Sequence, residues 1–138
     1  MAHTKFPVEV LTPEGEVFND EVEMVSTRTT VGEIGVLANM SPVLAMLEPT
    51  ELRLYKTEDE ILRFAQSEGY MQVGHNHVLL LVQEAHQPDQ LDTSDLRERL
   101  SAAESEMEAA GDDTEKRRVA ARDIRRWEAF IRVAEGSG

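Results

Sequence analysis

Residues 78–107 read VLLLVQEAHQPDQLDTSDLRERLSAAESEM, and the spacing of the apolar residues changes in the middle of this stretch. The short apolar run at its start, Val78–Val82, is typical of a buried strand. Gln87–Gln90 contains a proline and indicates a linker. Beyond the linker, apolar residues recur three or four positions apart, as in one stripe of a helix: Leu96, Leu100, Ala103 and Met107. The change of period predicts that two structurally different halves meet here.

Upstream of this stretch, the strand pattern repeats from Phe6 to about Glu84. Apolar residues alternate with polar ones or come in short runs: Val8–Val10, Val22–Val25 and Glu51–Tyr55. Residues that favour turns separate these runs: Thr12–Gly15, Val31–Gly35, Glu48–Thr50 and Gly74–His77. The sequence therefore predicts an antiparallel β-sandwich of about eight to ten strands.

A second helical stripe follows the first: Ala120, Ile124, Trp127, Ile131 and Ala134. Gly111 predicts the end of the first helix, and Asp113 or Thr114 can cap the start of the second. Asp92 or Thr93 can cap the first helix in the same way. Two helices joined by a turn as short as Gly111–Asp113 form an antiparallel hairpin. The fold class is therefore α+β, a sandwich followed by a two-helix hairpin.

The two periods divide the chain of 138 residues into three expected parts. We expect the sandwich domain at residues 1–86, a linker at 87–93 and the helical hairpin at 94–138. Hydrophobic residues make up 41% of the chain, which is enough to bury a core. There is no cysteine, so disulfides, a thiol nucleophile and cysteine-ligated zinc are excluded.

The composition also limits the location and the partners of the chain. No stretch approaches the roughly 18 consecutive apolar residues that span a bilayer, and the first residues lack the apolar run of a signal peptide. We therefore expect the chain to stay in the cytoplasm, where it can still lie at a membrane surface. Its net charge of -13 argues against a nucleic-acid partner, because phosphate binding needs an excess of lysine and arginine.

The charge is uneven, and the end of the chain is basic. Residues 115–138 contain four acidic and seven basic residues, a local net charge of +3. Five arginines of the second helix form a basic cluster: Arg117, Arg118, Arg122, Arg125 and Arg126. Such a run can be a solvated helix face, but in a strongly acidic protein it also suits an acidic protein partner.

Charges at the turn between the helices have the unfavourable sign for each helix dipole. Three acids, Glu104, Glu106 and Glu108, end the first helix, and three bases begin the second: Lys116, Arg117 and Arg118. We expect the arginines of the second helix to face these acids in the folded hairpin, where each exposed pair contributes about 0.2 to 1 kcal/mol. Such a hairpin is marginally stable and suited to exchanging partners.

Common catalytic signatures are absent from the sequence. There is no Gly-x-Ser-x-Gly, no Gly-x-x-x-x-Gly-Lys-Ser/Thr and no His-Glu-x-x-His, so we expect no catalytic site and no cofactor. His75 and His77 are the best metal candidates, since their spacing places both imidazoles on one face of a strand. Glu84 or Glu68 could complete such a site, and the alternative is a polar hairpin turn. Gly32–Gly35 is interpreted as a turn rather than a phosphate cradle, because its carboxylate would repel phosphate.

Several stretches of the first half resemble one family closely. Leu11–Phe18, Thr27–Leu37 and Ser41–Leu44 are similar to the N-terminal domain of ATP synthase epsilon subunits. Glu68–Val73, followed by Val78–Val82, resembles the strand pair of that family that begins Gly-Gly-apolar-apolar-x-Val, with a glutamate in place of the first glycine. The resemblance runs from about residue 6 to residue 134 and includes the plan of a sandwich followed by a helical hairpin.

The resemblance implies a non-catalytic rotor subunit of the central stalk, which couples the catalytic head to the membrane c-ring in proton-driven ATP synthesis. It implies that the sandwich docks on the foot of the gamma subunit and on the polar loops of the c-ring. The positions that fall at this contact are Glu33, Ile34, Gly35, Asn39, Met40 and Pro42. Many members have Pro-Gly-His or Pro-Asn-His where this chain has Ala38–Met40.

The same resemblance implies a hairpin that rises along gamma, meets the alpha/beta catalytic head and inhibits ATP hydrolysis. Because of their charge, the five arginines of the basic cluster are the expected regulatory contacts. It further implies a peripheral protein at the cytoplasmic face of the cell membrane. Some members bind ATP through Ile/Leu-Asp-x-x-Arg-Ala at the start of the first helix. Here Asp95 stands where the arginine belongs, and Asp92 with Arg97 is the remaining candidate pair for a nucleotide.

Two other functions stay open on the sequence alone. One is a stand-alone small β-domain that binds a metal or acts as an enzyme through His75 and His77. The other is a nucleotide sensor that acts through the helical hairpin, and this function is compatible with the rotor role.

Overall fold

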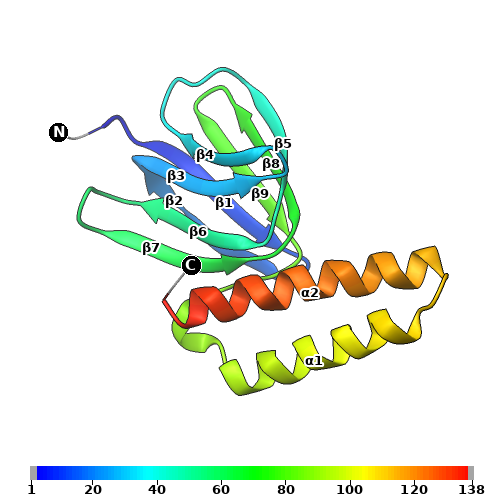
Figure 1. Ribbon diagram of the computed structural model, residues 1–138. Helices are drawn as coiled ribbons and strands as arrows, with labels where there is room; N and C mark the ends of the chain where they lie inside the picture. The colour runs from blue at the N-terminus through cyan, green and yellow to red at the C-terminus, as the bar shows by residue number, and fades with distance from the viewer. Residues whose placement is uncertain (1–2, 137–138) are drawn as a thin grey trace.

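The computed structural model describes residues 3–136, so the first two residues of the expected sandwich and the last two of the expected hairpin lie outside the described residues. The strands form a sandwich, and two helices lie across one end of it (Figure 1). The first nine strands are β1 Phe6–Thr12, β2 Gly15–Val22, β3 Met24–Thr29, β4 Gly32–Val36, β5 Val43–Leu47, β6 Thr50–Tyr55, β7 Ile61–Gln66, β8 Gly69–Gly74 and β9 His77–Val82. The remaining elements are β10 Ala85–His86, the 3-10 turn Pro88–Gln90, α1 Thr93–Ala109 and α2 Thr114–Ala134. The expected fold class is confirmed.

The ten strands belong to one curved sheet that folds over on itself. Its order is β10-β7-β6-β3-β5-β8-β9-β1-β2, and β4 pairs with β3 beside this path. Neighbouring strands are antiparallel except β1 and β9, which are parallel, with Val8 opposite Val78. The contact between β3 and β5 is a single residue pair, Thr29 with Leu47. The sheet turns at this short contact from one layer of the sandwich to the other.

Apolar side chains at every second position of the strands fill the space between the two layers of the sandwich. Phe6, Val8 and Val10 point inward from β1, and the other strands from β2 to β9 add residues of the same kind, such as Leu52 and Leu80. A buried polar group is also satisfied, since Thr27 donates to the side-chain oxygen of Gln66 at 2.7 Å. The sandwich therefore has a closed core of its own.

One expected turn is a strand. Gly32–Gly35 lies in β4, and the turn before it consists of Thr30 and Val31. The hydroxyl of Thr29 holds this turn, since it donates to the carbonyl of Gly32 at 2.9 Å and accepts from the N–H of Val31 at 3.2 Å. Gly32 has a φ of 129°, which a side chain would oppose. The turn therefore lies just before the expected stretch, and Gly32 is the first residue of β4.

The helical hairpin begins and ends its helices where the sequence predicts. The side chain of Asp92 accepts from the N–H groups of Ser94 and Asp95, and the side chain of Asp113 caps α2 in the same manner. Gly111 follows α1 with a φ of 56°, in the left-handed region that favours glycine. These caps depend only on neighbouring residues.

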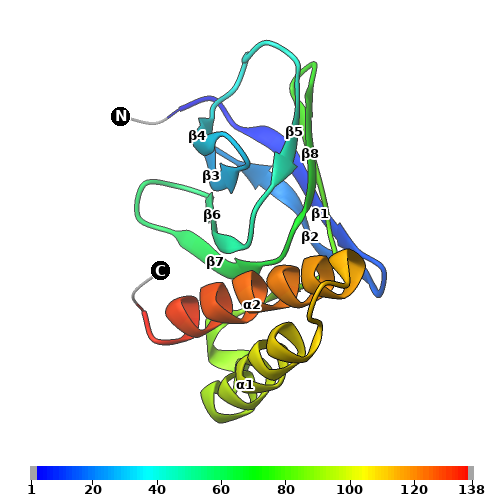
Figure 2. The ribbon, with the colours of Figure 1, turned by 45° about the vertical axis from the view of Figure 1, so that its right-hand side comes forward.

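Helix α2 lies between α1 and the sandwich (Figures 1 and 2). The expected stripe is buried at Ala120, Trp127 and Ile131. A second set on α2, not anticipated, is also buried: Ala129, Phe130 and Val133. Ala65 of β7 belongs to the same apolar cluster as Phe130 and Val133, so α2 buries one face on α1 and another on the sandwich.

Candidate interaction site

The positions expected at the c-ring lie along β4 and the loop that follows it. Glu33 is near the start of β4, the end of the strand that faces α2. Asn39, Met40 and Pro42 come after the other end of the strand, where Asn39 adopts a φ of 66°. Ile34 and Met40 pack partly against the core. The structure therefore separates Glu33 from the loop residues instead of gathering all six at one point.

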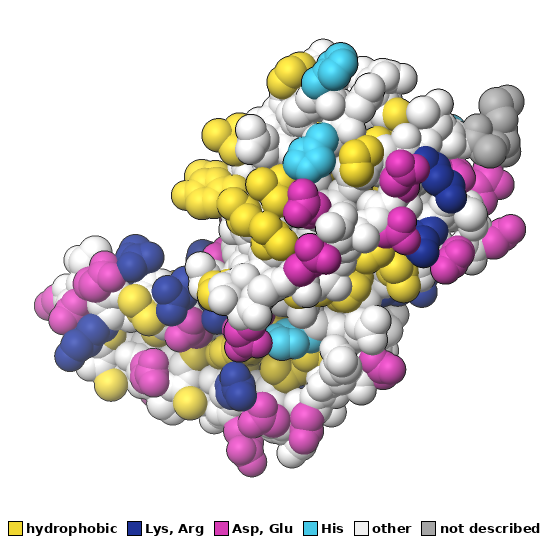
Figure 3. Space-filling model, turned by 180° about the vertical axis from the view of Figure 1, so that it is seen from behind, with side chains coloured by type: hydrophobic (Ala, Val, Ile, Leu, Met, Phe, Trp, Pro, Cys, Tyr) yellow, Lys and Arg dark blue, Asp and Glu magenta, His cyan; other side chains and the backbone are white. Residues whose placement is uncertain are grey.

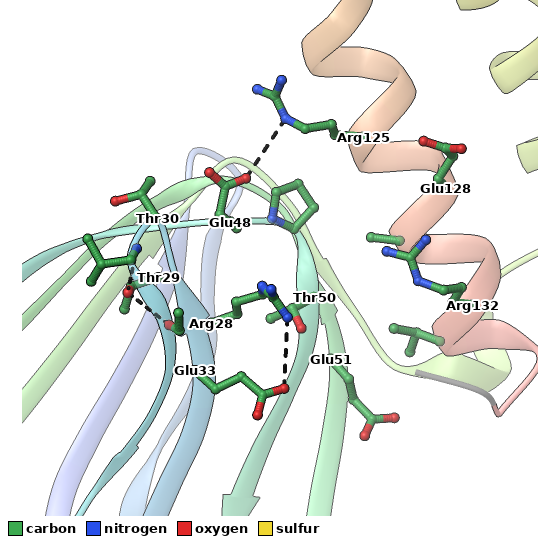
Figure 4. A pocket seen from close by; sticks show the side chains of 15 residues that line it. Arg28, Thr29, Thr30, Glu33, Glu48, Thr50, Glu51, Arg125, Glu128 and Arg132 are labelled. Carbon is green, nitrogen blue, oxygen red and sulfur yellow. Dashed lines mark hydrogen bonds and ion pairs between the residues drawn. The ribbon is translucent and has the colours of Figure 1, made fainter.

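A polar cleft of about 670 Å³ separates the β3–β4 turn and the β5–β6 connection from α2 (Figure 4). Arg125 of α2 reaches across it, with its Nε 3.8 Å from an oxygen of Glu48. Arg28 and Glu33 form a 3.9 Å pair on the strand side. Because carboxylates and guanidinium groups line the cleft together, it has no excess of positive charge that would select a phosphate.

The five arginines of the basic cluster divide into two groups. Arg117 donates to the carbonyl of Gly111, and Arg118 pairs with Glu115 at 2.6 Å, so both stay on the hairpin. The other three reach carboxylates of the sandwich: Arg122 lies 3.8 Å from Glu68, Arg125 lies 3.8 Å from Glu48, and Arg126 binds Glu68 and Glu84.

The expected pairing of these arginines with the acids of the first helix is wrong. Within residues 3–136, Glu104, Glu106 and Glu108 make no ion pair with α2. The physical reason is that α2 turns its apolar stripe toward α1, which leaves its basic residues to face the sandwich or solvent. An ion pair that does cross the hairpin joins Arg97 to Glu135 near the other end.

Arg126 makes the most extensive polar contact between α2 and the sandwich. Its Nε and Nη2 donate to the two carboxylate oxygens of Glu68, the former at 3.1 Å, and its Nη1 donates to Glu84 at 3.0 Å. The arginine side chain is only 12% exposed. We call Arg126, Glu68 and Glu84 the docking triad.

The contact between Arg126 and Glu68 shifts the pKa of both groups. Burial acts to raise the pKa of Glu68, but the hydrogen bonds and the charge of Arg126, together with the charge of Arg122, outweigh it and hold that pKa below its usual range. Burial likewise acts to lower the pKa of Arg126, and its bonds to Glu68 raise it instead. Glu68 and Arg126 are therefore both charged around neutral pH.

The hypothesis that Glu68 or Glu84 completes a metal site with His75 and His77 is wrong. The carboxylates flank the end of the β8–β9 pair where Gly69 faces Val82, and the histidines lie at the end where Gly74 faces His77. Five residue steps at about 3.3 Å separate the two ends by roughly 16 Å. His77 instead lies 3.3 Å from Glu9. Within residues 3–136, no three histidine or acidic side chains are grouped as metal ligands.

The candidate nucleotide residues have partners within the chain. Asp92 is occupied as the cap of α1, and Arg97 pairs with Glu135. Asp95, at the position of the missing arginine, pairs with Arg99 at 3.0 Å. The two candidates therefore serve the hairpin itself in this structure.

An exposed apolar face was missed in the sequence. Leu44, Met46, Tyr70 and Leu81 are each between 46% and 74% exposed. Met46 lies opposite Tyr70, and Tyr70 lies opposite Leu81, so they form a row across β5, β8 and β9. Figure 3 shows apolar side chains gathered on one flank of the sandwich. Leu44 and Met46 alternate with the inward-facing residues of β5, so this strand is apolar on both faces. Apolar residues at the outward positions are the sequence signal that could have revealed this face.

Comparisons with known proteins agree on one family. A family profile described as the ATP synthase, Delta/Epsilon chain, beta-sandwich domain matches residues 5–88. The ATP synthase epsilon chain of Persephonella marina is 32% identical and aligns over 94% of this chain and 91% of its own length. That of Staphylococcus aureus strain JH9 is 34% identical, with 93% and 95% covered.

Solved structures share the fold. A chain from the Euglena gracilis mitochondrial ATP synthase (OSCP/F1/c-ring) superposes with a TM-score of 0.77 at 20% identity, covering 91% of this chain and 79% of that one. A chain from the Tetrahymena thermophila mitochondrial ATP synthase, central stalk/c-ring, gives 0.62 at 14% identity, covering 97% and 99%. Neither helix described within residues 3–136 has the length and apolar character needed to cross a membrane.

Proposed function

The chain belongs to the ATP synthase epsilon-chain family, and we propose that it is a rotor subunit of the central stalk whose helical hairpin restrains ATP hydrolysis. As an epsilon chain it is a non-catalytic subunit of ATP synthase. In the proposed role it couples the catalytic head to the c-ring during proton-driven synthesis. It is then a peripheral protein that reaches the cytoplasmic face of the membrane through its assembly.

The exposed apolar face on β5, β8 and β9 is the observation that carries this proposal. Outward apolar side chains on three adjacent strands form a continuous surface, and such a surface marks a protein contact more often than a solvated face. We assign it to the gamma subunit. The neighbouring groove of about 480 Å³, which includes Leu11 and Pro13 at its edge, extends this surface.

The loop after β4 is assigned to the polar loops of the c-ring. Asn39, Ser41 and Pro42 are exposed there, and Asn39 is held in the left-handed region that shapes the loop. Glu33 remains a further contact on β4, whose partner strand within residues 3–136 is β3. A c-ring contact at this loop leaves the apolar face free for gamma.

The hairpin acts as the restraint through its arginines. Arg117 and Arg118 are exposed and have no sandwich partner within the described residues, so they can meet acidic groups of the alpha/beta head first. Arg122, Arg125 and Arg126 must release carboxylates of the sandwich before they can do the same. The docked and the extended hairpin therefore compete for the same cations.

The test measures binding of the purified chain to the purified gamma subunit. Tyr70→Glu and Leu81→Glu should each weaken binding about tenfold or more, because a carboxylate in an apolar contact loses its water without a partner. Ser101→Glu, at an exposed position of α1, is the matched control and should bind like the unmodified chain. Unchanged binding of both sandwich variants would assign the gamma contact elsewhere and remove the main support for the proposal.

A further inference from the structure

We propose that the docking triad, Arg126 with Glu68 and Glu84, is a latch that holds α2 on the sandwich and controls how often the helical hairpin can leave it. The inference rests on the proposed function only for the consequence of release, which is restraint of hydrolysis. The latch itself is a property of the isolated chain.

The geometry of the triad favours a specific contact over a loose charge attraction. All three guanidinium nitrogens of Arg126 donate, two to the carboxylate of Glu68 and one to Glu84. A planar fork that meets a carboxylate with two bonds fixes direction as well as distance. Glu68 lies between β7 and β8, and Glu84 lies between β9 and β10, so one side chain ties α2 to two chain connections.

Burial distinguishes this contact from the other ion pairs of α2. The Arg126 side chain is 12% exposed, whereas that of Arg125, which lies 3.8 Å from Glu48, is 60% exposed. Removing Glu68 leaves the shielded Arg126 with Glu84 as its remaining partner and with little water to replace the two lost bonds, which destabilises the docked state alone. An exposed pair loses little, because water replaces the partner.

Besides the longer ion pairs of Arg122 and Arg125, the remainder of the contact between α2 and the sandwich is a small apolar one. Phe130 and Val133 cover Ala65 of β7, and the ring of His86 meets Phe130 edge-on with centroids 6.0 Å apart. Helix α1 lies on the far side of α2 from the sandwich (Figure 2). A single helix face therefore holds the whole hairpin, and the triad supplies its strongest directional bonds.

Thiol labelling can measure release of the hairpin directly. The chain has no cysteine, and Ala65 is fully buried beneath the hairpin, so Ala65→Cys introduces a single thiol that reacts when α2 moves away. In this background, Glu68→Gln and Arg126→Gln should raise the labelling rate about tenfold or more. Glu48→Gln is the matched control, because its partner Arg125 is 60% exposed, and its labelling rate should stay within about twofold of that of Ala65→Cys alone. Rates for Glu68→Gln and Arg126→Gln within about twofold of the background would overturn the latch.

A double variant and an activity assay complete the test. If the triad acts as a unit, the double variant Glu68→Gln/Arg126→Gln should be labelled no faster than Arg126→Gln alone. A labelling rate raised by the product of the two single effects would overturn the shared contact. Retained strand signal in circular dichroism separates release from unfolding. In the assembled enzyme, Glu68→Gln should lower ATP hydrolysis. Faster labelling with unchanged hydrolysis would support the latch and count against the proposed restraint.

Discussion

The β-sandwich and the helical hairpin are stabilised by different means. Every strand from β1 to β9 contributes at least one buried side chain to the core of the sandwich. The hairpin has a smaller cluster that becomes complete only with Ala65 from β7, together with two caps and the docking triad. We therefore expect the sandwich to stay folded when the hairpin leaves it, since the two regions share few apolar side chains.

We expect the greatest loss of stability when a side chain of the sandwich core is shortened. Leu80→Ala should lower the free energy of unfolding by about 2 to 5 kcal/mol, because Leu80 is completely buried and its loss leaves a cavity. Leu81→Ala, at the exposed neighbouring position, should change it by less than about 0.5 kcal/mol. Urea unfolding followed by circular dichroism measures both. Equal losses of unfolding free energy in the two variants would mean that the exposed apolar face contributes to the stability of the fold.

Truncation after His86 tests whether the sandwich depends on the hairpin. The fragment should remain folded with a modest loss of thermal stability, since the core of the sandwich includes no residue of α1 or α2. It should still bind gamma, and enzyme assembled with it should hydrolyse ATP faster than with the full chain. Calorimetry of the fragment gives the answer, and an unfolded fragment would show that the hairpin completes the core.

Acid should loosen the contact between the two regions. The pKa of Glu68 is lowered in the folded chain from an ordinary value of 4.5, so its stabilising contribution is fully present above that value and is lost as pH falls through the lowered pKa. Trp127, the single tryptophan, packs edge-on against Phe130 and reports the change by fluorescence.

A matched titration isolates this carboxylate. The Glu68→Gln variant should show a smaller fluorescence change between about pH 6 and pH 3 than the unmodified chain, because the amide does not titrate. Identical titrations would assign the acid response to other groups.

The smallest expected effect is local to the hairpin. Asp113→Ala removes the side chain that accepts from the N–H of Lys116 and should cost about 1 kcal/mol of helix stability. Hydrogen exchange should quicken in the first turn of α2, while the strands keep their rates. Asp113→Asn retains an acceptor and should restore most of the protection. Faster exchange in the strands would contradict the independence of the two regions.

Features that depend on neighbouring residues could be predicted closely. The change from alternating to helical spacing near Pro88 placed the strands before it and the helices after it, and Asp92, Asp113 and Gly111 marked the helix ends. The family resemblance was readable from the same half of the chain that the family profile matches. Each of these signals lies within a few residues of the structure that it specifies.

The order of the elements, their caps and the family were readable from the chain alone, because the spacing of residues decides which faces of a strand or helix are apolar. The partners of the charged side chains, in contrast, follow from the way the helices pack on the sandwich. The acids near Gly111 seemed natural partners for the arginines, yet Arg126 binds Glu68 and Glu84, which are 58 and 42 residues away. An ion pair needs atoms within about 4 Å, and that proximity follows from how α2 packs its second apolar face on β7.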